Sequence, residues 1–133
     1  MDNLIKEIQG GVCAPQDVLA SSLTAGIKES GRSDMALLKF PAGTNSSGVF
    51  TKNLVCAAPV IICREVVKKN LLRAILINSG NANACTGEKG EKDARLLCSS
   101  LAELINCNPE NVAICSTGII GIQLPMLKML PAL

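Results

Sequence analysis

Histidine, tryptophan and tyrosine are missing from this 133-residue chain, which also has only two phenylalanines. Without histidine there can be no Ser/His or Cys/His catalytic pair, and the commonest zinc ligand is gone as well. Two phenylalanines give no aromatic platform for nucleic-acid bases, and 13 basic against 11 acidic residues leave a net charge of only +2. The composition therefore argues against a nucleic-acid partner, and any catalysis must proceed without imidazole.

Long apolar runs are also absent, so no membrane span is expected. The longest uncharged run, 111–127, is interrupted by Asn, Ser, Thr, Gln, Pro and Gly residues. The opening stretch MDNLIKEIQG mixes acidic and basic side chains and has no apolar core, so no secretory signal is predicted. No linker-like composition or internal repeat interrupts the chain, and its length suits one domain. We therefore expect a soluble, cytoplasmic protein that forms a single domain over residues 1–133.

Seven cysteines occur, but none forms a CxxC pair; they stand at positions 13, 56, 63, 85, 98, 107 and 115. In a chain without an export signal, such cysteines are expected to be reduced and mostly buried. Cys115 ends an apolar run and has no histidine partner, so a buried structural thiol is favoured over a thiol nucleophile. No metal or other cofactor is predicted.

The most regular element is an amphipathic helix predicted over residues 88–105. Its apolar residues recur at spacings of three and four, while its charged residues keep mostly to the other face. Short apolar runs at 73–78 and 111–115 flank the helix and predict strands. A crossover of this length suits two parallel strands in a right-handed β-α-β unit. The chain is therefore predicted to have an α/β fold in which this helix covers one side of a sheet.

The remaining segments are less regular. Further strand-like runs are predicted at 18–27, 35–40 and 48–51. A loop at 42–47 is expected to separate the last two runs. A buried segment at 59–63 should lead into a short helix at 64–70. A final helix is predicted at 124–130, with one proline in its first turn and another interrupting it.

The candidate site lies where the two parallel strands are expected to end. Loops at 79–87 and 116–121 should emerge side by side at the carboxyl edge of the sheet, where α/β proteins usually bind ligands. The second loop begins with Ser-Thr-Gly, so the Thr117 hydroxyl and the Gly118 amide could stabilise a developing negative charge, as an oxyanion hole does. The alternative for the same residues is a plain strand-ending turn or a helix cap.

The first of these loops, with the sequence NSGNANACTG, is rich in residues that tolerate unusual backbone conformations. Its amides could face a ligand or a neighbouring loop, and an internally hydrogen-bonded loop is the favoured interpretation. The overlapping stretch TGEKGEK lacks the GK[ST] ending of a phosphate loop, and Glu88 and Glu91 would repel phosphate. The carboxylates are expected on solvated helix faces, namely those of Glu65, Glu91, Asp93 and Glu103.

Four motifs in order give the chain a specific resemblance. They are GVCAPQDVLASSLTAGIK, SGVFTKNLVCAAPV, RAILINSGNANACTGEKGEKDAR and CSTGIIG. They are spread from residue 11 to residue 121, so the resemblance runs nearly end to end. On these motifs the sequence resembles the front of the ornithine acetyltransferase family, the glutamate N-acetyltransferases of arginine biosynthesis. The resemblance implies an α/β fold with a large mixed sheet and packed helices.

The resemblance also implies a mechanism. The family's precursor cuts itself before a threonine, which becomes an N-terminal nucleophile whose own α-amine can act as the base. An acetyl group moves from N-acetylornithine to this threonine and then to glutamate, so the substrates are small amino acids. Within this scheme Thr117 and Gly118 correspond to the oxyanion hole. The partner would be a downstream chain that carries the nucleophile, giving a hetero-oligomer of alpha and beta chains.

Part of the family pattern is not found in these 133 residues. None of the five threonines stands in the lysine-glycine-threonine cleavage motif. The sequence also has Leu54 and Cys56 where the family commonly has basic residues, and Ile122-Gln123 where a charged or proline-containing pair is frequent. We therefore expect an N-terminal part that ends before the cleavage site and is inactive alone, with an apolar sheet face left uncovered. The alternative is a non-catalytic remnant or interaction subunit that keeps the fold.

Overall fold

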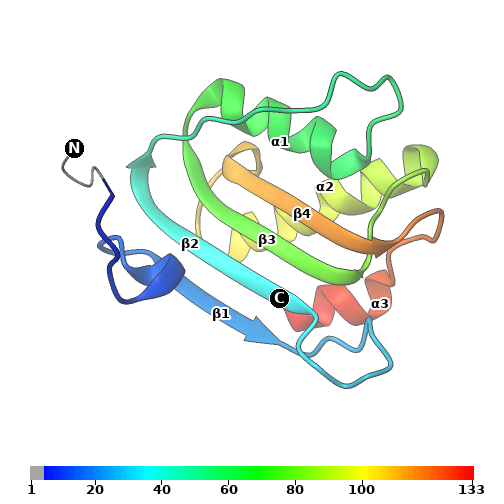
Figure 1. The fold of residues 1–133 in the computed structure, drawn as a ribbon. Coiled ribbons are helices and arrows are strands. Elements are labelled where there is room, and N and C mark those ends of the chain that lie inside the picture. The colour runs from blue at the N-terminus through cyan, green and yellow to red at the C-terminus, as the bar shows by residue number, and fades with distance from the viewer. Residues whose placement is uncertain (1–4) are drawn as a thin grey trace.

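A four-stranded mixed sheet forms the centre of the computed structural model, which describes residues 5–133 (Figure 1). Residues 1–4, within the stretch where no secretory signal is predicted, lie outside the described residues. The strand order is β1-β2-β3-β4, and the strands are β1 (Leu19–Leu23), β2 (Met35–Thr44), β3 (Leu72–Asn81) and β4 (Val112–Ile119). The first two pairings are antiparallel and the β3-β4 pairing is parallel. The sheet is thus mixed, as expected.

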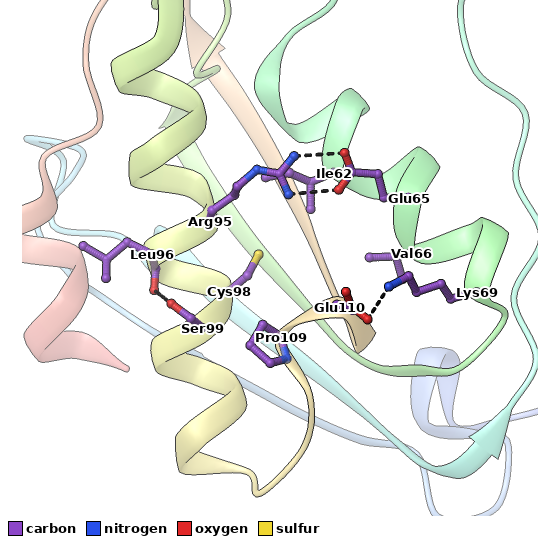
Figure 2. A pocket seen from close by; sticks show the side chains of 10 residues that line it. All are labelled: Ile62, Glu65, Val66, Lys69, Arg95, Leu96, Cys98, Ser99, Pro109 and Glu110. Carbon is purple, nitrogen blue, oxygen red and sulfur yellow. Dashed lines mark hydrogen bonds and ion pairs between the residues drawn. The ribbon is translucent and has the colours of Figure 1, made fainter.

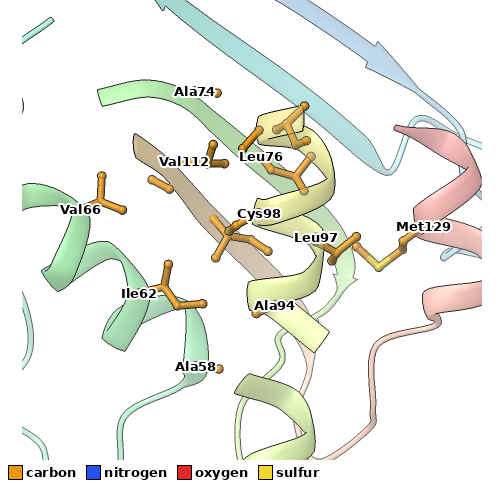
Figure 3. Packing of buried hydrophobic residues seen from close by; sticks show 14 of the residues in the cluster. Ala58, Ile62, Val66, Ala74, Leu76, Ala94, Leu97, Cys98, Val112 and Met129 are labelled. Carbon is orange, nitrogen blue, oxygen red and sulfur yellow. The ribbon is translucent and has the colours of Figure 1, made fainter. Parts of the chain in front are cut away.

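The predicted β-α-β unit is confirmed. Helix α2 (Gly87–Leu104) connects β3 to β4, with a 3₁₀ turn at Pro109–Asn111 just before β4. The helix turns its apolar stripe toward the sheet, and that stripe is fully buried at Ala94, Leu97, Cys98 and Leu101. Figure 3 shows Ala94, Leu97 and Cys98 of α2 in one apolar cluster with residues of β3, β4 and α1, and Leu101 belongs to the same cluster. This layer fixes where the carboxyl ends of β3 and β4 lie.

The region predicted as a buried segment and a short helix is one helix, α1 (Ala58–Lys69). Proline suits the first turn of a helix, so Pro59 does not interrupt it. Buried residues recur every four positions at Ala58, Ile62 and Val66, which places α1 on the same side of the sheet as α2. The helix ends at Asn70, whose φ of 53° is the left-handed conformation typical of a helix end.

Two predictions about the remaining elements were wrong. Strand β2 extends to Thr44, into the segment predicted as a loop at 42–47, and its register shifts between Lys39 and Thr44, which accommodates Pro41. Residues 48–51 form no strand, since Val49 is fully exposed and the segment has no pairing partner in the part of the chain described. The last helix is shorter than predicted: α3 (Met126–Met129) runs into a 3₁₀ turn at Leu130–Ala132. A 3₁₀ turn at Gly11–Cys13 and the short strand β1 complete the N-terminal half.

One face of the sheet has no helix over it among the described residues (Figure 1). Side chains alternate along β3, so those between its buried positions point away from α2. On β3 these are mainly Ile75 and Ile77, which are half-buried, and on β4 they include Cys115 and Thr117, which are exposed. We call this surface the open face. Its centre is apolar, with Leu38 of β2 paired beside Ile75.

An apolar sheet surface without a covering layer favours association. We expect the isolated chain to self-associate at micromolar concentration, and Ile77→Lys to increase the monomer fraction in sedimentation-velocity measurements. Leu127→Lys is the matched control, because Leu127 is 94% exposed but lies on α3, outside the sheet. A wild-type chain that sediments as a monomer at all concentrations would contradict this expectation.

Candidate site at the carboxyl edge of the parallel strands

Strands β3 and β4 end at the same edge of the sheet, as predicted for a parallel pair. The predicted strands were too short, because β3 extends to Asn81 and β4 to Ile119, into the segments expected to be loops. The pairing runs through Ser79 with Thr117 and through Gly80 with Gly118, and an irregularity follows at Asn81. Ser-Thr-Gly is therefore part of β4, and the strand-ending-turn alternative is wrong for these residues. The chain turns only after Ile119.

Close backbone contact explains why a glycine- and serine-rich stretch stays in the sheet. A Cβ atom placed on Gly118 would lie 2.3 Å from the carbonyl carbon of Gly80 and 2.5 Å from the amide nitrogen of Asn81. Gly118 also has a φ of 135°, which side chains rarely allow. The two strands can approach this closely only because Gly118 lacks a side chain. Residues 116–118 have a sequence typical of a turn, but their pairing with β3 keeps them in the sheet.

The two proposed oxyanion donors, the Thr117 hydroxyl and the Gly118 amide, belong to exposed residues. Thr117 and Gly118 are both exposed, and within residues 5–133 the Thr117 hydroxyl makes no hydrogen bond. Beside Gly118 lies an open groove of about 630 Å³, lined by Ile27, Lys28, Glu29, Ser30, Ser79, Gly80, Gly118 and Ile119. Gly118 lines this groove, and Thr117 is its neighbour in β4. A hydroxyl and a backbone amide are the two kinds of donor that an oxyanion hole uses.

The asparagine-rich loop after β3 is internally hydrogen-bonded and also tied to the segment after β4. Asn81 accepts from the Asn83 amide at 2.8 Å and donates through Nδ2 to the carbonyls of Ile122 and Gln123 at 2.9 and 3.0 Å. The Gln123 side chain donates back to the Thr86 carbonyl at 2.9 Å. The amides thus face a neighbouring loop, one of the two possibilities the sequence left open. The Gln123 side chain is therefore part of the connection between the two loops.

Asn83 is the centre of the loop and is fully buried. Its Nδ2 donates to the Gly90 carbonyl at 2.9 Å, and its Oδ1 accepts from the Thr86 hydroxyl at 2.7 Å. There is no room for a side chain at Gly90, where a Cβ atom would lie 2.4 Å from Asn83 Oδ1. This bond pair therefore fixes the start of α2 against the loop.

Asn83→Ala should lower the free energy of unfolding by about 2–4 kcal/mol, because it leaves the buried Thr86 hydroxyl without its acceptor and removes the side-chain bond to the Gly90 carbonyl. Urea unfolding followed by far-ultraviolet circular dichroism measures the change. Asn106→Ala is the control: Asn106 has a similar positive φ, 56° against 46°, but is exposed. Equal losses in the two variants would contradict the importance of the buried bonds.

The cysteines are less buried than the sequence predicts. All seven are free, and only Cys98 is buried, whereas most were expected to be. Burial raises the pKa of the Cys98 thiol to about 12, and the neighbouring Cys63 adds to this. Cys115, expected to be a buried structural thiol, is exposed because its position alternates with Ile114 and points to the open face. The thiol-nucleophile alternative for Cys115 still lacks a histidine base, since the sequence has none.

A separate cleft of about 340 Å³ lies between α1 and α2, at the end of the sheet where β4 begins. Figure 2 shows that its charges are already paired: Arg95 binds Glu65 through two bonds of 2.9 Å, and Lys69 contacts Glu110. The Arg95 guanidinium lowers the pKa of the Glu65 carboxyl. Half-exposed pairs of this kind contribute little to stability. The cleft is remote from Thr117 and offers no unpaired charge to a ligand.

The helix-face carboxylates predicted from the sequence are half-buried or exposed, as expected, and three of them pair with cations within the helix layer. Glu88 occupies the first turn of α2, which supports the sequence argument against phosphate there. Across residues 5–133 no group of three or more cysteine and carboxylate side chains could hold a metal ion. No helix in this range is long and apolar enough to cross a bilayer.

Sequence reasoning missed Asp34 and the segment that it holds. Asp34 is 2% exposed, just before β2, and its carboxylate accepts hydrogen bonds from the amides of Ala25, Ile27 and Lys28. Burial alone would raise the pKa of this carboxyl, but the three amide donors and the charge of Lys28 lower it. The only sequence signal was an acidic residue directly before an apolar run, which is equally typical of a turn.

The chain is similar in sequence and in fold to proteins of one family. Residues 19–133 match the ArgJ family. An arginine biosynthesis bifunctional protein ArgJ from Caldanaerobacter subterraneus is 49% identical over 92% of this chain and 30% of its own length. A crystal structure of ornithine acetyltransferase complexed with ornithine, from Mycobacterium tuberculosis, has a TM-score of 0.86 and 42% identity over 91% of this chain and 66% of that chain. A Bacillus halodurans ArgJ structure has the same TM-score at 34% identity, with 92% and 64% covered. The chain spans about 30% of the length of the curated relatives.

Proposed function

The chain belongs to the ArgJ family, and from that premise we propose that residues 1–133 form the N-terminal domain of a self-processing glutamate N-acetyltransferase. The observation that carries the proposal is the edge where β3 and β4 end. There Thr117 and Gly118 are adjacent and exposed, and Gly118 lines a groove large enough for an amino-acid substrate. We propose these two groups as the oxyanion hole of the acetyl transfer.

The chemistry follows from the donors and from the missing histidine. The nucleophile is an N-terminal threonine of the segment that follows in the family, and its α-amine takes the hydroxyl proton. The threonine oxygen attacks the acetyl carbonyl of N-acetylornithine, and the resulting oxyanion accepts hydrogen bonds from Thr117 and Gly118. The C–N bond breaks, ornithine leaves with the proton on its amine, and the acetyl group stays on the threonine. The glutamate amine then attacks this ester and regenerates the hydroxyl.

The open face is the docking surface for the segment that supplies the nucleophile. Thr117 points to that face, so a layer packed on Ile75 and Ile77 would bring its own residues next to the oxyanion donors. The assembled protein is thus a hetero-oligomer of alpha and beta chains that acts on small amino acids in the cytoplasm.

The proposal is tested by producing this chain together with the remaining C-terminal region of the Caldanaerobacter relative, which is 49% identical where the two overlap. Acetyl transfer from N-acetylornithine to labelled glutamate is expected from the pair and from neither part alone. Transfer by this chain alone would contradict the missing-nucleophile part of the proposal.

The second candidate is a non-catalytic interaction subunit that keeps the fold. Exposed Leu54, at a position where the family commonly has a basic residue, is compatible with it, because losing a charge there costs the fold nothing. The same co-production separates the candidates: a pair that copurifies but transfers no acetyl group supports the interaction subunit.

A further inference from the structure

Asp34 joins two parts of the candidate site through both its side chain and its backbone. Oδ1 accepts from the Ala25 amide at 2.7 Å, and Oδ2 accepts from the amides of Ile27 and Lys28 at 2.6 and 3.0 Å. Its backbone carbonyl accepts from the Ser79 amide at 2.8 Å, next to the paired glycines of β3 and β4. One buried residue therefore ties the segment 25–28 to the end of β3.

The segment 25–28, which Asp34 holds, contacts Gly80 at the candidate site. A Cβ atom on Gly80 would lie 2.9 Å from Ile27 Cγ2 and 2.9 Å from Lys28 Cγ, so these side chains rest on the glycine itself. Gly80 in turn lies against Gly118, since a Cβ atom on Gly118 would lie 2.3 Å from the Gly80 carbonyl carbon. Ile27 and Lys28 also line the groove beside Gly118. The contacts thus form an unbroken series from the Asp34 carboxylate to the proposed oxyanion donor.

A second, weaker tie holds the same segment. Lys128 of α3 donates through Nζ to the Gly26 carbonyl at 2.6 Å, and this bond is exposed. Charge-assisted bonds to buried carboxylates are stronger than exposed ones, so Asp34 is the main anchor and Lys128 the auxiliary one.

We propose that Asp34 is a positioning residue of the acetyl-transfer site: by anchoring segment 25–28 on Gly80, it holds the Gly118 amide and one wall of the groove in place. This inference rests on the proposed function. Asp34 contacts no reacting atom, so its effect reaches the reaction only through the segment. Substrate binding is shared among many groups, whereas the oxyanion donor acts in the transition state, so loosening it lowers kcat more than it changes KM.

The test uses Asp34→Asn in the co-produced pair. The change keeps the shape but puts an amide group against backbone donors, so one or more of the three bonds is lost. We expect kcat to fall about 10- to 100-fold with KM within about twofold. The amide protons of Ala25, Ile27 and Lys28 should exchange at least about tenfold faster, while those of α2 do not change. Asp93→Asn is the matched control, since Asp93 pairs with Lys89 on the helix surface and should leave kcat unchanged.

If Asp34→Asn does not fold, Lys128→Met decides, because it loosens the same segment from the surface. A fall in kcat of about threefold, together with faster exchange of the Ile27 and Lys28 amides, is the expected result. Faster exchange at these amides with unchanged kcat, in either variant, would overturn the positioning role, as would unchanged exchange in Asp34→Asn. Absence of transfer in the wild-type pair is a different outcome, since it rejects the proposed function itself.

Discussion

Gly118→Ala is expected to abolish acetyl transfer in the assembled protein and to lower the free energy of unfolding by about 3–5 kcal/mol. Two costs add at this position. The new Cβ would lie 2.3 Å from the backbone of Gly80, which cannot move aside as a flexible side chain could. The backbone at φ 135° is also one that alanine adopts only with strain. Urea unfolding and the transfer assay measure the two effects.

Gly121→Ala separates these costs. Gly121 also has a positive φ, 82°, but nothing lies within 4 Å of a Cβ atom placed there. Only the conformational cost of about 1–2 kcal/mol is expected, with transfer largely retained. Similar behaviour of the two variants would show that the close approach of β3 and β4 does not matter for the site.

Thr117→Ala is expected to lower kcat about 100- to 1000-fold in the co-produced pair, the usual effect of removing one oxyanion-hole donor. Its effect on stability should stay within about 0.5 kcal/mol, because Thr117 is exposed and its hydroxyl makes no hydrogen bond within residues 5–133. The rate effect and the stability effect are therefore separable here, unlike at Gly118.

Two further substitutions identify the group responsible. Thr117→Val keeps the shape without the hydroxyl and should match Thr117→Ala, whereas Thr117→Ser keeps the hydroxyl and should retain most of the rate. A fully active Thr117→Ala variant would remove the hydroxyl from the mechanism. Rates that follow side-chain volume, with Thr117→Val active, would assign Thr117 a packing role instead.

Periodicity was enough to predict the β-α-β unit. The apolar stripe of α2 and the short runs on either side of it identify the parallel pair and the edge where the candidate site lies. The extent of the two strands could not be predicted. Glycine, serine and threonine at 116–118 are typical of a turn, and only the contact with Gly80, distant in sequence, keeps them in the sheet.

The surroundings of the candidate site could not be predicted from the sequence either. Whether Cys115 is buried depends on which face of β4 it occupies and on what covers that face, and a local apolar run carries neither fact. Asp34 precedes an ordinary strand, and its three amide partners are placed by the fold of a loop six to nine residues earlier. The candidate donors came from the Ser-Thr-Gly sequence and from the family resemblance, while the groove beside Gly118 and its anchor came from the structure.

The central claim is that this chain supplies half of an acetyl-transfer site whose nucleophile comes from the segment that follows in the family. Mass spectrometry of the co-produced pair, quenched shortly after mixing with N-acetylornithine, tests it most directly. The account predicts an acetyl group on the N-terminal threonine of the downstream segment, formed much more slowly with Thr117→Ala in this chain. An acetyl group that forms equally fast with the variant, or that forms on the downstream segment without this chain, would contradict it.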